Sequence, residues 1–126
     1  MKPEVQEAVA ELRACFPAAV VSADDDGSGG AFVTVDPIDP GPAYRQDRTR
    51  LKFHISHMYP DADVYPLFVR PDLRRVDGRG HGRGFAAGSF RNESALQLSR
   101  RSNNRTAEFD TAARKVLKVI EWMHAQ

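Results

Sequence analysis

The sequence has one cysteine, Cys15, and no long apolar run. A single cysteine allows no internal disulfide and no cysteine zinc cluster. No apolar stretch approaches the roughly 20 residues that a membrane-spanning helix needs. The first residues, MKPEVQEAVAELRACFP, include acidic side chains in an amphipathic pattern, unlike a signal peptide. We therefore expect a cytoplasmic protein with no membrane partner.

The net charge of the chain is also small. Its 126 residues carry a formal charge of +1 at pH 7, so bulk charge indicates no class of partner. Hydrophobic residues make up 41% of the chain and charged residues 28%, which is typical of a soluble globular protein. This length suits one hydrophobic core, and we expect a single domain over residues 1–126.

Amphipathic patterns predict a helix near each end of the chain. Residues 3–16 place apolar side chains at helical spacing, and Pro17 ends this helix. Residues 111–124 repeat the pattern, with Asp110 as the expected N-cap.

Short apolar segments between these helices predict four strands. AAVVSA and AFVTV flank the turn DDDGSGG, which predicts a hairpin over residues 18–35. Residues 50–55 alternate between apolar and polar side chains, as a half-buried strand does, and residues 67–69 resume an apolar strand. Residues 72–93 lack apolar periodicity, which predicts a long irregular loop. The expected fold is α+β: an N-terminal helix, a four-stranded antiparallel meander, the long loop and a C-terminal helix.

Arginine is concentrated in one part of the chain. Nine arginines lie between residues 70 and 105, where only three acidic residues oppose them. Such a segment is either a solvated loop or a docking face for an acidic partner or a carboxylate. Tyrosine and phenylalanine are not interleaved with these arginines as nucleic-acid stacking platforms would be, so we expect no nucleic-acid partner.

Other patterns predict neither a metal nor a cofactor. The segment DDDGSGG begins like a calcium loop, but Val35 stands where the bidentate glutamate is needed. The four histidines lack the paired spacing of metal ligands, which favours solvent-facing side chains. Cys15 is expected near the buried side of the first helix, as a structural cysteine.

Two longer segments resemble a known superfamily. TRLKFHISHMYPDADVYPLFV is similar to the third strand, Tyr-Pro turn and fourth strand of the ubiquitin-conjugating-enzyme (UBC) fold. QLSRRSNNRTAEFDTAARKVLKVIEWM resembles a prokaryotic branch of that superfamily, in which a "WSRR" word precedes an aspartate-led helix. That branch is typically encoded beside ubiquitin-like proteins and an activating enzyme. The resemblance covers residues 49–126, and the earlier part matches only in the order of its elements.

The resemblance implies a UBC-like fold and a protein that accepts a ubiquitin-like modifier from an activating enzyme and transfers it to a target protein. The chain departs from the family pattern, because no cysteine lies ahead of the last helix and the His-Pro-Asn triplet is absent. The resemblance then implies a serine oxyester, with Ser99 as the nucleophile or Ser94 in a different alignment.

Further roles follow from the same resemblance. Asn103 or Asn104 would donate to the oxyanion, and Arg100 and Arg101 would hold the carboxyl-terminal tail of the modifier. A serine needs a base, for which the sequence offers three histidines: His54, His57 and His81. The alternative is a catalytically inactive UBC-like variant that binds a ubiquitin-like protein or an activating enzyme. In that case Ser99 caps a turn and the asparagines satisfy backbone groups of the loop.

Overall fold

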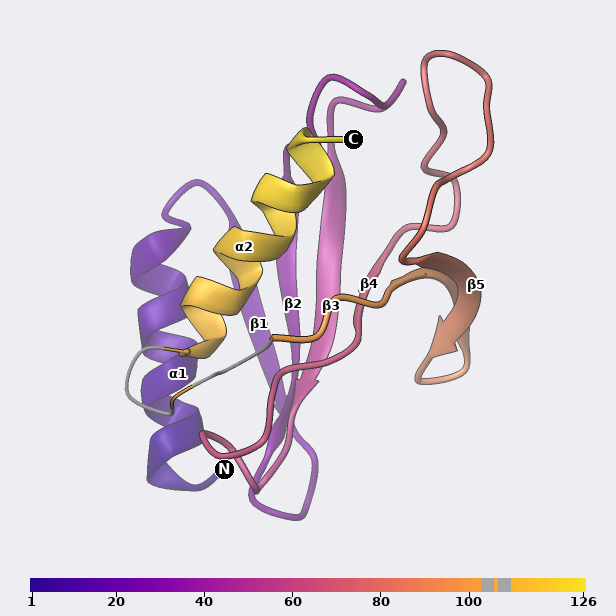
Figure 1. Cartoon of the computed structure of the whole chain (residues 1–126). Helices are drawn as coiled ribbons and strands as arrows, with labels where there is room; N and C mark the ends of the chain where they lie inside the picture. Colours follow the sequence, from indigo (N-terminus) through magenta and orange to yellow (C-terminus); the bar gives the residue numbers. More distant parts are fainter. Residues whose placement is uncertain (103–105, 107–109) are drawn as a thin grey trace.

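A computed structural model describes residues 1–102, 106 and 110–126 of the chain. It contains two helices and six strands, with these bounds: α1 (Pro3–Cys15), β1 (Val20–Asp25), β2 (Ala31–Ile38), β3 (Thr49–Ile55), β4 (Leu67–Val69), β5 (Phe85–Phe90), β6 (Glu93–Leu98) and α2 (Ala112–His124). The strands form one sheet in the order β1-β2-β3-β4-β6-β5, and each neighbouring pair is antiparallel. Both helices lie on the same face of this sheet (Figure 1).

The core lies between the helices and the sheet. It is formed by every second residue of the strands and by the apolar faces of the helices. In β3 the alternating residues Leu51, Phe53 and Ile55 are fully buried beneath the helices. The buried face of α1 includes Val5 and Leu12, which are also fully buried. Burial of each such side chain contributes about 1.5–3 kcal/mol, so these alternating positions fix the register of the sheet.

The structure confirms the α+β class, the antiparallel sheet and the two end helices. Asp110 was expected to be the N-cap of the C-terminal helix, but the N-cap is the next residue, Thr111. The Thr111 hydroxyl accepts a hydrogen bond from the Arg114 amide at 3.3 Å. Cys15 was expected near the buried side of α1, but it is exposed at the last residue of that helix, so that expectation is wrong.

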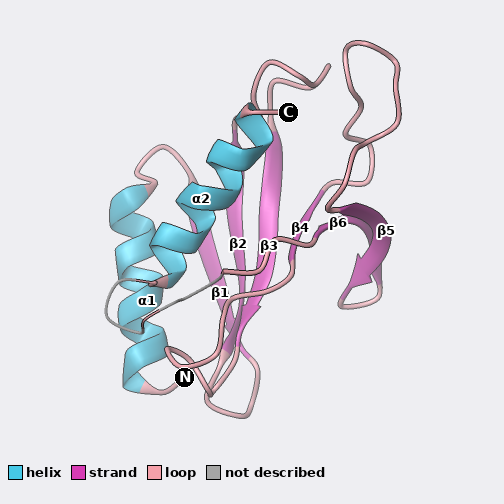
Figure 2. Ribbon diagram, in the orientation of Figure 1, coloured by secondary structure: helices cyan, strands magenta, loops and turns pink. Residues whose placement is uncertain are grey.

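The prediction of a four-stranded meander is wrong, because the predicted loop over residues 72–93 contains β5 and the start of β6. These strands form a hairpin at the edge of the sheet far from α1, as Figure 2 shows. Its two-residue turn consists of Arg91 and Asn92, whose φ angles are 50° and 67°. Positive φ at both central positions is the geometry of a type I′ turn. The hairpin could not be predicted from the sequence, because its turn has no glycine and β5 is composed mainly of small residues.

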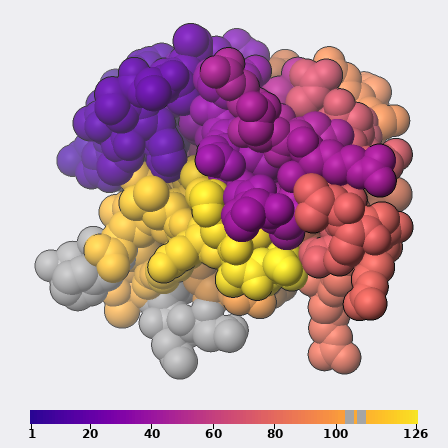
Figure 3. All heavy atoms as spheres, turned by 90° about the horizontal axis from the view of Figure 1, so that it is seen from above, coloured from indigo at the N-terminus to yellow at the C-terminus, as the bar shows by residue number. Residues whose placement is uncertain are grey.

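The C-terminal end of α2 lies between two loops. Figure 3 shows this end (yellow) against the segment near residue 40 (purple) and the loop near residue 80 (salmon). On the first side, the His124 ring is hydrogen-bonded through Nε2 to the Asp39 carbonyl at 2.9 Å. On the second side, the Trp122 ring stacks on Phe85 of β5, with ring centroids 4.8 Å apart. The stacked pair attaches the β5–β6 hairpin to α2.

Candidate functional site

Ser99 is the first residue after β6, and its backbone extends the hairpin ladder. The Ser99 amide donates to the carbonyl of Gly84 at 2.7 Å. Its half-buried hydroxyl accepts a hydrogen bond from the Gln97 side-chain amide at 3.1 Å. Ser99 therefore lies between the β5–β6 hairpin and the arginine-containing segment, residues 100–102.

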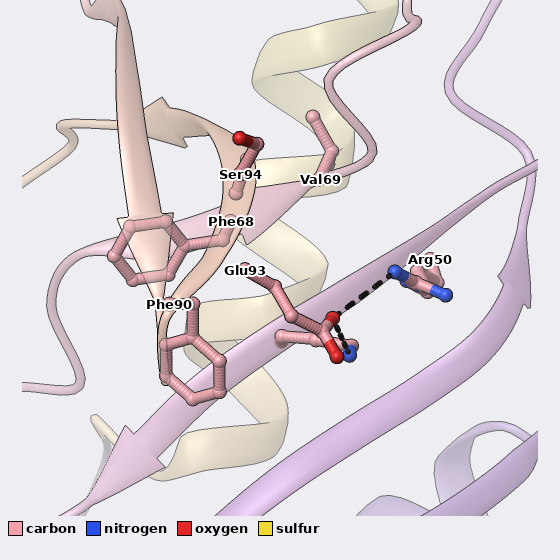
Figure 4. Close-up of a pocket in the computed structure, with 8 residues that line it drawn as sticks. Arg50, Phe68, Val69, Phe90, Glu93 and Ser94 are labelled. Atoms are coloured by element: carbon pink, nitrogen blue, oxygen red, sulfur yellow. Dashed lines mark hydrogen bonds and ion pairs between the residues drawn. The ribbon is translucent and has the colours of Figure 1, made fainter.

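Ser94 lies at the other end of β6, where it is exposed and pairs with Ser89 of β5. Ser99 is five positions further along the extended chain, or about 16 Å away at 3.3 Å per residue. Figure 4 shows Ser94 and the neighbouring Glu93, whose carboxylate pairs with Lys52 at 3.3 Å and with Arg50 at 3.8 Å. The hollow beside Ser94 has a volume of about 10 Å³, which is room for about one water molecule. The two serines thus belong to different surfaces.

A buried lysine fixes the segment that follows Ser99. Lys115 of α2 is 5% exposed, and its ammonium pairs with the Asp63 carboxylate at 3.0 Å. The same ammonium donates to the Ser102 hydroxyl at 3.1 Å and to the Arg100 carbonyl. The Ser102 amide in turn donates to Asp63 at 2.9 Å. Residues 100–102 are thus held against α2 by contacts to charged groups, which are stronger than those between neutral groups.

The side chains of Arg100 and Arg101 are held on aromatic rings. The Arg101 guanidinium lies 4.1 Å from the centroid of the Tyr65 ring. The Arg100 guanidinium lies 5.2 Å from that of the Trp122 ring. Both arginines are exposed, and neither forms an ion pair with a carboxylate in the part of the chain that the structure describes. Stacking orients a guanidinium while its N–H groups remain available at the edge.

These residues surround a polar cleft of about 240 Å³, lined by Arg100, Arg101, Ser102, Lys115, Lys118 and Val119. Lys118, at its rim, pairs with Asp110 at 2.9 Å, and Lys115 is paired with Asp63. In the part of the chain that the structure describes, the two arginines are therefore the cations of the cleft that have no carboxylate partner. The chemistry fits a carboxylate, which a guanidinium binds through two parallel hydrogen bonds.

The histidines expected to act as a base lie elsewhere. The Nε2 atom of His54 lies 2.7 Å from the Asp26 carboxylate, and that of His81 lies 2.9 Å from the Leu73 carbonyl. The contact with His54 lowers the pKa of Asp26 from 3.8 to about 2, with help from the backbone amides of Ser28 and Gly30. Within the described ranges, no histidine ring is hydrogen-bonded to either candidate serine.

The remaining candidates, Asn103 and Asn104, lie outside the described residues. Sequence reasoning missed Lys115, although a signal was present: it occupies the apolar face of α2 defined by Ala112, Val116 and Val119. A lysine at such a position needs a buried partner. Its partner Asp63 lies far away in sequence, so nothing in the spacing could identify it.

Comparison with protein-family models, with curated proteins and with solved structures finds no match to this chain. Neither helix in the described ranges has the length and apolar character that crossing a membrane requires. Among the residues placed by the structure, no group of three or more His, Cys, Asp or Glu side chains could hold a metal ion.

Proposed function

We propose that this protein is a UBC-like binding module that holds the carboxyl-terminal tail of a ubiquitin-like protein at Arg100 and Arg101. One observation carries the proposal. Two exposed guanidinium groups, which have no acidic partner among the described residues, are fixed on aromatic rings beside a cleft. The identity of the ligand comes from the sequence resemblance, and its charge from the geometry.

The geometry favours binding over acyl transfer. A serine hydroxyl ionises far less readily than a thiol, so an ester-forming serine needs a neighbouring base. Lys115 is close to Ser102, but it donates to the Asp63 carboxylate, the Arg100 carbonyl and the Ser102 hydroxyl, so its contacts are those of a donor and not of a base. The Ser99 hydroxyl accepts its hydrogen bond from an amide, which also gives it no base. Transfer of the modifier through an ester on Ser99 or Ser94 stays a prediction. The second part of the experiment below tests it.

The experiment uses a ubiquitin-like protein and its activating enzyme, the partners that the resemblance implies, with binding measured by calorimetry. Arg100→Ala/Arg101→Ala should weaken binding of the ubiquitin-like protein by about 2–3 kcal/mol, as loss of charge-assisted hydrogen bonds does. The matched control is Arg45→Ala/Arg48→Ala, which removes the same charge from two exposed arginines outside the cleft. Equal affinity of both double variants would contradict the proposal.

A second arm adds ATP and searches for a covalent adduct that resists thiol reductants and is cleaved by hydroxylamine. Binding without such an adduct supports the module. An adduct abolished by Ser99→Ala, or by Ser94→Ala, would establish the carrier in its place. An adduct removed by thiol reductants would instead implicate Cys15.

A further inference from the structure

β5 is an edge strand of the sheet. It lies at one end of the strand order, and among the described residues it pairs with β6 alone. Its sequence, FAAGSF, has no charge and no proline, and Ala86, Ala87 and Ser89 are exposed. The small side chains leave its backbone accessible.

The turn determines which backbone groups point outward. In a hairpin with a two-residue turn, the flanking residues Phe90 and Glu93 exchange hydrogen bonds, and so does every second pair behind them. The bond from the Ser99 amide to the Gly84 carbonyl continues the same alternation. The amides and carbonyls of Ala87 and Ser89 therefore face away from β6. Beyond the β5–β6 ladder, no hydrogen bond within the described chain uses them.

The opposite edge of the sheet is protected, whereas this one is not. On β1 the outward carbonyl of Val21 accepts two hydrogen bonds from the Arg13 guanidinium, at 3.2 and 3.3 Å. That strand also ends in two carboxylates, Asp24 and Asp25. Charged side chains and covered backbone groups are the usual devices that keep other strands away from an edge. β5 has no charged side chain, and no hydrogen bond among the described residues covers its outward backbone groups.

Charge differs between the two ends of β5. At the Phe90 end the cations are already paired, Arg91 with Asp24 at 3.0 Å and Lys52 with Glu93 at 3.3 Å. At the Phe85 end Arg83 is exposed and forms no ion pair in the described part of the chain. Arg100 lies over Trp122, which stacks on Phe85, so a second cation without an ion pair among the described residues is present at this end.

We infer that β5 accepts an extended peptide as an added antiparallel strand, with the terminal carboxylate of that peptide at the Phe85 end, near Arg83 and Arg100. An antiparallel partner runs from Phe90 towards Phe85, so its carboxyl end meets the unpaired cations. Backbone hydrogen bonds to Ala87 and Ser89 give affinity that depends little on side chains. The inference rests on the proposed function for the identity of the peptide, which would be the tail of the ubiquitin-like protein.

The test uses two probes: the ubiquitin-like protein of the proposed function, and a labelled octapeptide of alternating valine and threonine with a free or an amidated carboxyl end. Ala87→Pro removes one outward amide without removing a bond to β6. It should weaken binding of both probes about tenfold, as loss of a docking hydrogen bond does. Ala23→Pro, on the protected edge strand β1, is the matched control and should leave both affinities unchanged.

The carboxylate is tested separately. Arg83→Ala should weaken binding of the free-acid peptide about fivefold and leave binding of the amidated peptide unchanged. Arg79→Ala is the control, since Arg79 is exposed in the same loop. In the wild-type chain, hydrogen exchange of the Ala87 and Ser89 amides should slow at least tenfold when either probe is bound. This measurement decides the matter if circular dichroism shows that Ala87→Pro does not fold.

Each outcome is distinct. Undiminished binding to Ala87→Pro, or unchanged exchange at Ala87 and Ser89, overturns the inference and leaves the proposed function standing. Edge-dependent binding of the peptide without binding of the ubiquitin-like protein supports strand addition and refutes the proposed function. Binding of neither probe refutes both. A dimer seen by ultracentrifugation that Ala87→Pro abolishes, with no peptide binding, identifies a second copy as the added strand and overturns the inference.

Discussion

Lys115 is a charged residue on the buried face of an amphipathic helix. Its ammonium joins α2 to Asp63, which precedes β4, and to the backbone of the arginine-containing segment after β6. Removal of one partner from a buried ion pair leaves the other charge without compensation, and that costs more than the intact pair contributes. This residue therefore connects the stability of the fold to the position of Arg100.

Lys115→Ala should lower the free energy of unfolding by about 3–5 kcal/mol, measured by urea denaturation. Lys118→Ala is the matched control three residues away. Lys118 also forms an ion pair, with Asp110, but its side chain is 53% exposed, so its removal should cost less than about 1 kcal/mol. Similar costs for the two variants would show that burial of Lys115 does not determine its contribution.

Asp26 gives a second prediction at the scale of a residue, for acid stability. Its carboxylate accepts from His54 and from backbone amides of the β1–β2 turn, which lowers its pKa to about 2 in the folded chain, from 3.8. Since the folded-state pKa is the lower one, this stabilisation is complete above pH 3.8 and is lost as pH falls through about 2.

The comparison is between wild type and Asp26→Asn in urea denaturation at pH 7, 4 and 2. The wild type should be more stable at pH 7, and the difference should be nearly the same at pH 4 and clearly smaller at pH 2. Asp24→Asn, whose carboxylate is 70% exposed, serves as control and should show a smaller pH dependence. A constant difference between wild type and Asp26→Asn would exclude the carboxylate charge as the cause.

At the scale of an element, the β5–β6 hairpin depends on its turn. Asn92 has a φ of 67°, a region in which asparagine is tolerated and β-branched residues are strained. Asn92→Val should cost about 1–2 kcal/mol of unfolding free energy. Asn92→Gly should be neutral or stabilising, because glycine suits the second position of a type I′ turn. If Asn92→Val had a higher melting temperature than Asn92→Gly, the turn would have another conformation.

The same hairpin shows what limits prediction from this sequence. Period-two alternation in residues 50–55 and helical spacing at both ends identified β3, α1 and α2, because burial on one face imposes those periods. β5 has no such pattern, since it lies at an edge and its residues are mostly small. Stacking of Phe85 on Trp122 holds it in place, and those residues are far apart in the sequence.

At the scale of the whole molecule, the candidate site depends on contacts between distant parts of the chain. The sequence drew attention to the arginines near residue 100 and to Ser99. It could not show that Tyr65 and Trp122 support the two guanidinium groups, or that Asp63 pairs with Lys115. Each of these contacts brings together residues more than ten positions apart, a separation over which local patterns carry no information.

The strand order also affects synthesis of the chain. β4 lies between β3 and β6, but residues 70–92 are made before β6 begins. Ribosomes add about 5–20 residues per second, so β4 lacks its second neighbour for roughly a few seconds after it emerges. All three of its residues, Leu67, Phe68 and Val69, are buried in the finished protein. During that interval they form an apolar strand edge, which chaperones would bind and at which a nascent chain could pair with another.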